Sequence, residues 1–284
     1  MKIIQKNYSS VIGFCLLLLS VMLSTEAVGK NLYLKSSAAV VMDQETGTIL
    51  YEKKSNDVRP IASITKLMTA MVLLDSKPNL AKRITISDKD VDHLRHSRSR
   101  LPVGTTLTIL EMLRLALMSS ENRAASALSR SYRGGKSAFV KAMNRKAAAL
   151  GLKYTRFRDP TGLYTENKST ARELAKLVAA ATKYPLIRTM TTTESHVQKV
   201  GRKTLKYNNT NVLTKNPNWQ IGLSKTGFIN EAGKCLVMQT WLNNRPTIIV
   251  LLNSWGQMTP IGDSNRIKEW IGGISVAELQ RKGF

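Results

Sequence analysis

Cysteine, histidine and aromatic residues are scarce in this 284-residue chain, and its 43 basic residues far outnumber its 19 acidic ones. With two cysteines and three histidines, neither a disulfide framework nor a Cys/His metal cluster is suggested. The aromatic content is 6%, and the basic residues are spread along the chain, so no nucleic-acid-binding module stands out. What the chain has is apolar material, 43% of its residues, which suffices for one large domain or two closely packed lobes.

The first 27 residues have the composition of an export signal. Lys2 and Lys6 supply positive charge, residues 11–23 are apolar, and the small residues Thr25 and Ala27 fit a cleavage site. An apolar run of this length is short for a membrane span. We therefore expect a cleaved signal peptide ending near Ala27, followed by an exported mature chain with at most peripheral membrane association.

The mature chain keeps nearly all of the charge. Without the first 27 residues, 41 of the 43 basic and 18 of the 19 acidic residues remain. Such an excess implies anionic surroundings, which for an exported protein means the cell envelope. Cys235 is then the single cysteine, so no internal disulfide is expected, and its apolar neighbours predict a small core residue.

Secondary-structure patterns divide the chain into three blocks. Residues 38–42 and 48–53 read as a hairpin of two strands, and after Tyr184 the composition becomes rich in β-branched residues. Between them lie helical patterns that begin near residues 63, 108, 123, 136 and 170, two of them with capping boxes. The last block contains predicted strands at 221–228, 233–242 and 247–253 and a closing helix capped by Asp263.

This order predicts an α+β fold. An antiparallel sheet of about five strands, flanked by N- and C-terminal helices, would receive strands from both ends of the chain. We expect residues 28–284 to form one domain, in which a helical lobe at about 63–183 is inserted between strand blocks 35–55 and 190–275. The active site would then lie between the two lobes.

The helix that begins near residue 63 carries the first candidate for chemistry. Ile64, Leu67 and Met71 predict one buried face, and Ser63 and Lys66 are neighbours beside it. A lysine one turn after a serine can accept the hydroxyl proton and activate the oxygen as a nucleophile. Ser-x-x-Lys also occurs by chance, however, and a serine at a helix start is most often an N-cap.

Two further stretches strengthen the catalytic interpretation. Ser120 and Asn122 lie at a break between two predicted helices, so both side chains can face a cleft. Residues 225–227, Lys-Thr-Gly, lie on the first strand after the helical block, where the glycine lets a bound chain approach the backbone. Ser-x-x-Lys, Ser-x-Asn and Lys-Thr-Gly in this order form the motif set of penicillin-binding proteins and serine β-lactamases.

The flanking residues extend the match. Five segments resemble the low-molecular-mass serine D-Ala-D-Ala peptidases. They are the segments around Ser63 and Ser120, Pro-Thr-Gly-Leu at 160–163, Ser-Thr-Ala-Arg at 169–172 and Lys-Thr-Gly-Phe at 225–228. Within that group they are most similar to the penicillin-binding protein 7 type DD-endopeptidases, over about residues 35–275. The resemblance implies a periplasmic hydrolase that acts on peptidoglycan peptides, uses no cofactor or metal, and is inhibited covalently by β-lactams.

The resemblance also implies roles. Ser63 would attack the carbonyl of a D-alanine, a neutral Lys66 would be the base, and Ser120 would relay a proton to the leaving nitrogen. Asn122 would hold the peptide or Lys66. Burial of Lys66 and the nearby charge of Lys225 would both lower the pKa of Lys66.

The remaining residues of the set would bind the substrate. Lys225 and Thr226 would receive the substrate carboxylate at the position that Gly227 keeps open. The backbone N–H groups of Ser63 and Phe228 would form the oxyanion hole.

Departures from the pattern bear on the substrate. DD-carboxypeptidases of this group often carry Asn-Arg-Asn before the Lys-Thr-Gly strand, whereas this chain has Asn-Thr-Asn at 209–211. The chain also ends soon after the closing helix, where many carboxypeptidases have a β domain and an amphipathic anchor. Both departures favour cleavage of cross-links over a carboxypeptidase.

Two other functions stay open. A class A β-lactamase would need Glu-x-x-x-Asn, and the nearest candidate, Glu166 to Thr170, lacks the asparagine. An idle, basic envelope-binding protein would not need the intact motif residues. His93 and His96 have no evident third ligand, and His196 lies in a β-like stretch, so we expect solvated or surface positions for all three.

Overall fold

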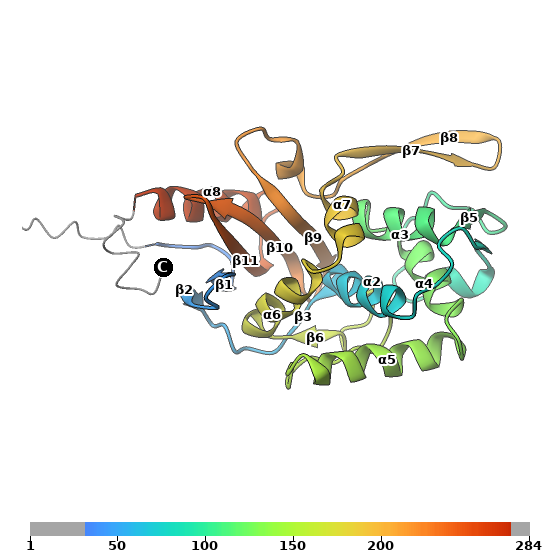
Figure 1. Cartoon of the computed structure of the whole chain (residues 1–284), viewed down its shortest axis with the longest axis horizontal. Coiled ribbons are helices and arrows are strands. Elements are labelled where there is room, and N and C mark those ends of the chain that lie inside the picture. Colours follow the sequence, from blue (N-terminus) through green and yellow to red (C-terminus); the bar gives the residue numbers. More distant parts are fainter. Residues whose placement is uncertain (1–31, 274–284) are drawn as a thin grey trace, which may run out of the picture. The chain divides into compact units, whose positions relative to one another are not determined.

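The computed structural model describes residues 32–273, and its centre is a five-stranded antiparallel sheet (Figure 1). The strand order is β2-β1-β11-β10-β9, so the opening and closing parts of the chain pair with each other. The strands are β1 (Ala38–Asp43), β2 (Ile49–Lys53), β9 (Ile221–Ile229), β10 (Gly233–Leu242) and β11 (Arg245–Ser254). The predicted α+β fold is confirmed. No helix precedes β1 within residues 32–37, and the predicted signal peptide lies outside the described residues.

Side chains alternate between the two faces of the sheet, and both faces are covered. On β1, Ala38 and Val40 join the core shared with the helical block, while Ala39 and Val41 face the other way. The second face packs on Ile267 of α8 (Thr259–Gly272). Because both faces are buried, β1, β10 and β11 read as nearly continuous apolar runs.

The remaining elements form the insertion between β2 and β9. Two short ladders pair β3 with β6 and β4 with β5. The insertion's elements are β3 (Arg59–Pro60), η1 (Ala62–Ile64), α2 (Thr65–Asp75), β4 (Arg83–Thr85), η2 (Asp88–Asp90), β5 (Thr106–Thr108), α3 (Ile109–Met118), α4 (Asn122–Arg130), α5 (Gly135–Ala149), β6 (Lys168–Ser169), α6 (Ala171–Ala181), α7 (Pro185–Thr192), β7 (Ser195–Val200), β8 (Lys203–Asn208) and η3 (Val212–Lys215).

Helix α2 is the core of the insertion. The sequence pattern predicts one buried face, but every residue from Thr65 to Leu73 is buried. The helix has neighbours on all sides, since α3, α4, α5, α6 and α7 all pack against it. The prediction of a one-sided helix was wrong because its apparent polar flank faces the interior of the protein, and that flank contains Lys66.

Helix α7 was not predicted. The stretch after Tyr184 is rich in threonine, and the sequence suggests β structure there, whereas residues 185–192 are helical. Pro185 fits the first turn of a helix, and Ile187 and Met190 are buried on one side. Packing against β9 and α3 therefore outweighs the β propensity of the threonines.

The three predicted helix caps have three different outcomes. Thr108 and Glu111 form the expected capping box at α3. Thr170 accepts from the Glu173 backbone N–H at α6, but the Glu173 carboxylate accepts from Tyr154 N instead. The Asp263 prediction was wrong because α8 begins earlier, at Thr259, and the Asp263 carboxylate accepts hydrogen bonds from the segment before β1.

Strands β7 and β8 form a hairpin of their own, outside the central sheet (Figure 1). Gln198 attaches the hairpin to α3 by donating to Glu111 at 2.9 Å. His196 is half-buried on β7 beside Gln198.

Residues 32–273 contain no helix that is long and apolar enough to cross a membrane.

Candidate active site

The turn that carries Ser63 is held between two glycines. A Cβ atom on Gly162 would lie 2.0 Å from the carbonyl oxygen of Ala62, and one on Gly227 would lie 3.1 Å from the Ser63 nitrogen. Ala62 itself has φ +47°, a conformation that non-glycine residues rarely adopt. The backbone before Ser63 is thus fixed by close contact with the 159–163 turn on one side and β9 on the other.

Ser63 and Lys66 are in contact. Lys66 Nζ lies 2.8 Å from Ser63 Oγ, 2.7 Å from Asn122 Oδ1 and 2.7 Å from the Thr161 carbonyl oxygen. Ser63 does not cap α2, whose N-cap position is Ile64 and has no side-chain cap. Of the two interpretations of this serine, the structure excludes the simple cap.

Burial favours the neutral form of Lys66. The lysine is 1% exposed, and desolvation lowers its pKa to about 7, although the charges of Asp159 and Glu121 oppose the shift. A neutral amine has two N–H groups and one lone pair. The oxygens of Asn122 and Thr161 can only accept, so they take the two N–H groups and leave the lone pair facing the Ser63 hydroxyl.

A second serine–lysine pair lies beside the first. Lys225 Nζ donates to Ser120 Oγ at 3.0 Å and to the Thr226 carbonyl oxygen at 2.9 Å. Burial, and then the charge of Lys66, lower the pKa of Lys225 well below its usual range. The expectation that Lys225 lowers the pKa of Lys66 was wrong: burial lowers that pKa, and the charges that act on it, Asp159 and Glu121, raise it. The repulsion between the two lysines lowers the pKa of Lys225 instead. Ser120 has φ +62°, a strained value at the break between α3 and α4.

A cleft of about 350 Å³ opens over these groups. Ser63, Ser120 and Asn122 line it from the helical block, and Thr226, Gly227 and Phe228 line it from β9. Lys66 and Lys225 are buried and do not line the cleft. The predicted site residues are thus brought together, with the hydroxyls at the surface of the cleft and the amines behind them.

The part of the cleft lining contributed by α8 is apolar, and Lys234 of β10 also lines the cleft. Met258, Pro260 and Ile261 line it near the start of α8. Lys234 Nζ lies 3.6 Å from the centre of the Phe228 ring, which is a cation–π contact. Thr226 Oγ1 donates to Thr210 Oγ1 at 2.6 Å, so the middle residue of the 209–211 loop touches the Lys-Thr-Gly strand.

Sequence reasoning missed two groups at the site. The Thr161 carbonyl oxygen contacts Lys66, and Ser97 Oγ accepts from Asn122 Nδ2 at 2.9 Å. The matched Pro-Thr-Gly-Leu stretch points to the first but assigns it no role, and Ser97 lies in what the sequence presents as a polar loop. His93 and His96 are exposed, and residues 32–273 contain no group of three or more potential metal ligands.

Comparisons with known proteins agree with this geometry. The model of the D-alanyl-D-alanine carboxypeptidase family matches residues 25–256. The D-alanyl-D-alanine endopeptidases of Pseudomonas aeruginosa and Escherichia coli are 49% and 44% identical to the chain, over 84% and 83% of its length and 77% of theirs. The Streptomyces K15 DD-transpeptidase structure is 29% identical over 86% of this chain and all of its own, with a TM-score of 0.80. The chain therefore belongs to the D-alanyl-D-alanine carboxypeptidase family.

Proposed function

We propose that this serine DD-peptidase is a D-alanyl-D-alanine endopeptidase, which hydrolyses peptidoglycan cross-links through an acyl-enzyme on Ser63. The observation that carries the proposal is the 2.8 Å contact between Ser63 Oγ and a buried Lys66 whose pKa is about 7. A lysine with that pKa is substantially neutral at neutral pH and can accept the serine proton.

In this mechanism Ser63 Oγ attacks the carbonyl carbon of a D-alanine as its proton moves to Lys66 Nζ. The oxyanion accepts hydrogen bonds from the backbone N–H groups of Ser63 and Phe228. A relay through Ser120 then carries that proton from Lys66 to the leaving nitrogen, the amide bond breaks, and an ester on Ser63 remains with Lys66 neutral again. Water hydrolyses that ester, with Lys66 again as the base, and releases the peptide acid.

Substrate binding follows from the charges beside β9. A substrate carboxylate placed near Lys225 and Thr226 favours the protonated form of Lys225, whose pKa is otherwise depressed by burial and by Lys66. The role predicted for Gly227 is not the one its surroundings support, because a side chain there would meet the backbone of the Ser63 turn and not a bound chain. Binding of the carboxylate therefore supplies the partner that the buried ammonium lacks.

The choice of endopeptidase over carboxypeptidase rests on the 209–211 loop. Thr210 touches Thr226 where carboxypeptidases of the group often place an arginine, so a small terminal carboxylate has no guanidinium clamp. The relatives named endopeptidases, with 49% and 44% identity, support the same choice. Glu166 does not support the β-lactamase alternative, because its side chain is exposed and accepts a hydrogen bond from Thr165.

We also propose that the enzyme is periplasmic, with residues 28–284 as one peptidase domain behind a cleaved signal. Its strong positive charge would hold it near the anionic envelope. β-Lactams would acylate Ser63 covalently by the same mechanism, and the acyl-enzyme they form would be hydrolysed slowly.

The test uses labelled penicillin and purified cross-linked peptidoglycan. The wild-type protein should form a stable penicillin adduct and convert cross-linked peptides to monomers, whereas Ser63→Ala should do neither. Ser137→Ala, which removes an exposed hydroxyl on α5, is the matched control and should behave as wild type. Release of terminal D-alanine without loss of cross-links would show a carboxypeptidase, rapid penicillin turnover a β-lactamase, and absence of any adduct an idle protein.

A further inference from the structure

The loop between η2 and β5 presents one side chain to the site. Residues 95, 97 and 99 are half-buried, whereas His96, Arg98 and Arg100 are exposed. The Asp92 carboxylate fixes the turn before them by accepting from the backbone N–H groups of Leu94, Arg95 and Ser97. The Ser97 hydroxyl also donates to this carboxylate, so its oxygen is left to accept from Asn122. This alternation places the Ser97 hydroxyl on the side of the loop that faces α4.

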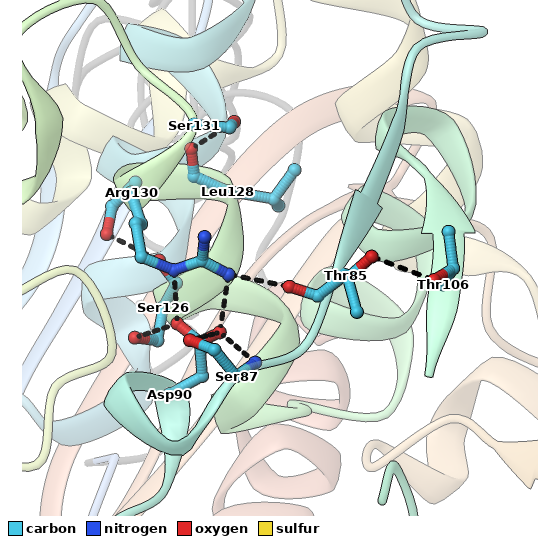
Figure 2. A network of polar contacts seen from close by, with 9 residues as sticks. Thr85, Ser87, Asp90, Thr106, Ser126, Leu128, Arg130 and Ser131 are labelled. Carbon is cyan, nitrogen blue, oxygen red and sulfur yellow. Dashed lines mark hydrogen bonds and ion pairs between the residues drawn. The ribbon is translucent and has the colours of Figure 1, made fainter. Parts of the chain in front are cut away.

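Both ends of this loop are attached to the helical block. Figure 2 shows Arg130 and Ser126 of α4 directed at the carboxylate of Asp90, at 2.7 Å and 2.9 Å. At the other end Arg123 donates to the Leu101 carbonyl oxygen at 2.8 Å. Ser97 is thus held at a fixed place relative to α4, whose first residue is Asn122.

The Asn122 carboxamide has two faces with opposite chemistry. In the observed orientation, Oδ1 accepts from Lys66 and Nδ2 donates to Ser97 Oγ. If the amide were rotated by half a turn, its NH2 group would face Lys66. A neutral Lys66 would then have to use its lone pair to accept from Asn122, and the lone pair would no longer be available to Ser63.

We propose that Ser97 is a positioning residue, which holds the Asn122 carboxamide with its oxygen toward Lys66 and so keeps the lysine lone pair aimed at Ser63. The proposal rests on the proposed function, because it concerns the base of the same reaction. Ser97 acts through Asn122 and contacts neither Ser63 nor Lys66 in the hydrogen bonds of the site.

The test measures the rate of penicillin acylation as a function of pH. In Ser97→Ala the amide is free to rotate, and we expect the maximal acylation rate to fall about tenfold. A carboxamide NH2 near Lys66 disfavours the ammonium form, so the midpoint of the pH profile should move to lower pH. Mere loosening of the site would admit water and move the midpoint upward, which would contradict the proposal.

Three variants make the test specific. Ser97→Thr keeps the hydroxyl and should retain most of the rate, whereas Ser97→Cys, which keeps the volume but accepts weakly, should lose it. Ser99→Ala removes another hydroxyl of the same loop, one that donates to Glu121, and should change the rate by no more than about twofold. Equal losses in Ser97→Ala and Ser99→Ala would overturn the proposal.

A double-mutant cycle separates this proposal from the proposed function. In an Asn122→Ala background, Ser97→Ala should cause no further loss, because the group it positions is absent. A full loss in that background would contradict the positioning role. Absence of an adduct in the wild-type protein would overturn the proposed function, whereas a wild-type rate in Ser97→Ala would overturn the positioning role alone.

Discussion

Two buried ionisable side chains, Lys66 and Asp263, have different kinds of partners. The Asp263 side chain is fully buried on α8 and accepts from the backbone N–H groups of Lys35 and Ser36 at 2.9 Å and 2.7 Å, and from Arg266. These hydrogen bonds outweigh desolvation and lower the pKa of Asp263, which favours its charged form. Lys66 contacts neutral oxygens only, and desolvation lowers its pKa, which favours its uncharged form.

The difference shows how burial produces either a structural link or a reactive group. Asp263 gains hydrogen bonds and a guanidinium partner, so it stays charged and fastens the segment before β1 to α8. The acids near Lys66, Asp159 and Glu121, act on it only through their charge and only partly offset its burial. A buried cation without a direct anionic partner is held close to deprotonation, which is the property that a general base requires.

Removal of the Lys66 amine should have the largest effect on activity. Lys66→Met keeps an unbranched chain of similar length, and we expect penicillin acylation to fall at least about a thousandfold, the size of a general-base contribution. The free energy of unfolding should stay the same or rise, because a costly buried cation is removed. Acylation kinetics and denaturant unfolding measure the two quantities. A large loss of stability in Lys66→Met would show that Lys66, like Asp263, stabilises the fold.

Removal of the Asp263 carboxylate should have the reverse profile. Asp263→Ala leaves the backbone N–H groups of Lys35 and Ser36, the Ser36 hydroxyl and Arg266 without this acceptor. The loss should lower the free energy of unfolding by about 2–4 kcal/mol. The acylation rate of the folded protein should remain that of wild type, since Asp263 is not among the residues that line the cleft. Urea unfolding and the penicillin assay measure the two quantities. An acylation defect in an Asp263→Ala protein of wild-type stability would contradict a purely structural role for Asp263.

The pH dependence of acylation should follow Lys66. The reactive form is the neutral amine, so the rate should rise as pH increases through about 7, by about tenfold between pH 6 and pH 8. The plateau lies above that range because the lysine is then deprotonated. Single-turnover acylation at fixed ionic strength measures the profile. A rate that still rises between pH 9 and pH 11 would mean an unshifted lysine.

The smallest expected effect is on acid stability. The pKa of Asp263 is lower in the folded protein than in the unfolded chain, so its stabilisation is present above the unfolded value near 3.8. It is lost as pH falls through the lower, folded value. Asp263→Asn should therefore flatten the fall of stability with acid, which thermal unfolding at several pH values below 5 can measure. If stability falls with pH as steeply in Asp263→Asn as in the wild type, Asp263 is not the cause of the acid dependence.

The residues of the candidate site could be found from the sequence because the three motifs are local patterns in a fixed order. Residue type and spacing identify Ser63, Lys66, Ser120, Asn122 and residues 225–228. The structure brings these residues together at one cleft. The paired strands of the central sheet were predictable for a similar reason, since alternation and turn residues are local signals.

The remaining features depend on contacts that residue identity does not encode. The Thr161 oxygen belongs to the backbone, so no residue type signals that it will contact Lys66. Ser97 differs from other loop serines only in what lies opposite it in the fold. Asp263 has the residue type of a cap but bonds to a segment 227 residues away, and α7 forms because burial outweighs local propensity.

The most direct test is the pKa of Lys66 itself. The ¹⁵N-lysine side-chain resonances can be titrated by NMR in the wild-type protein, and the Lys66 signal is the one that disappears in Lys66→Met. The account predicts a midpoint near pH 7 for that signal. A midpoint near 10.5, the ordinary value for lysine, would mean a charged Lys66 at neutral pH and would contradict its role as the base.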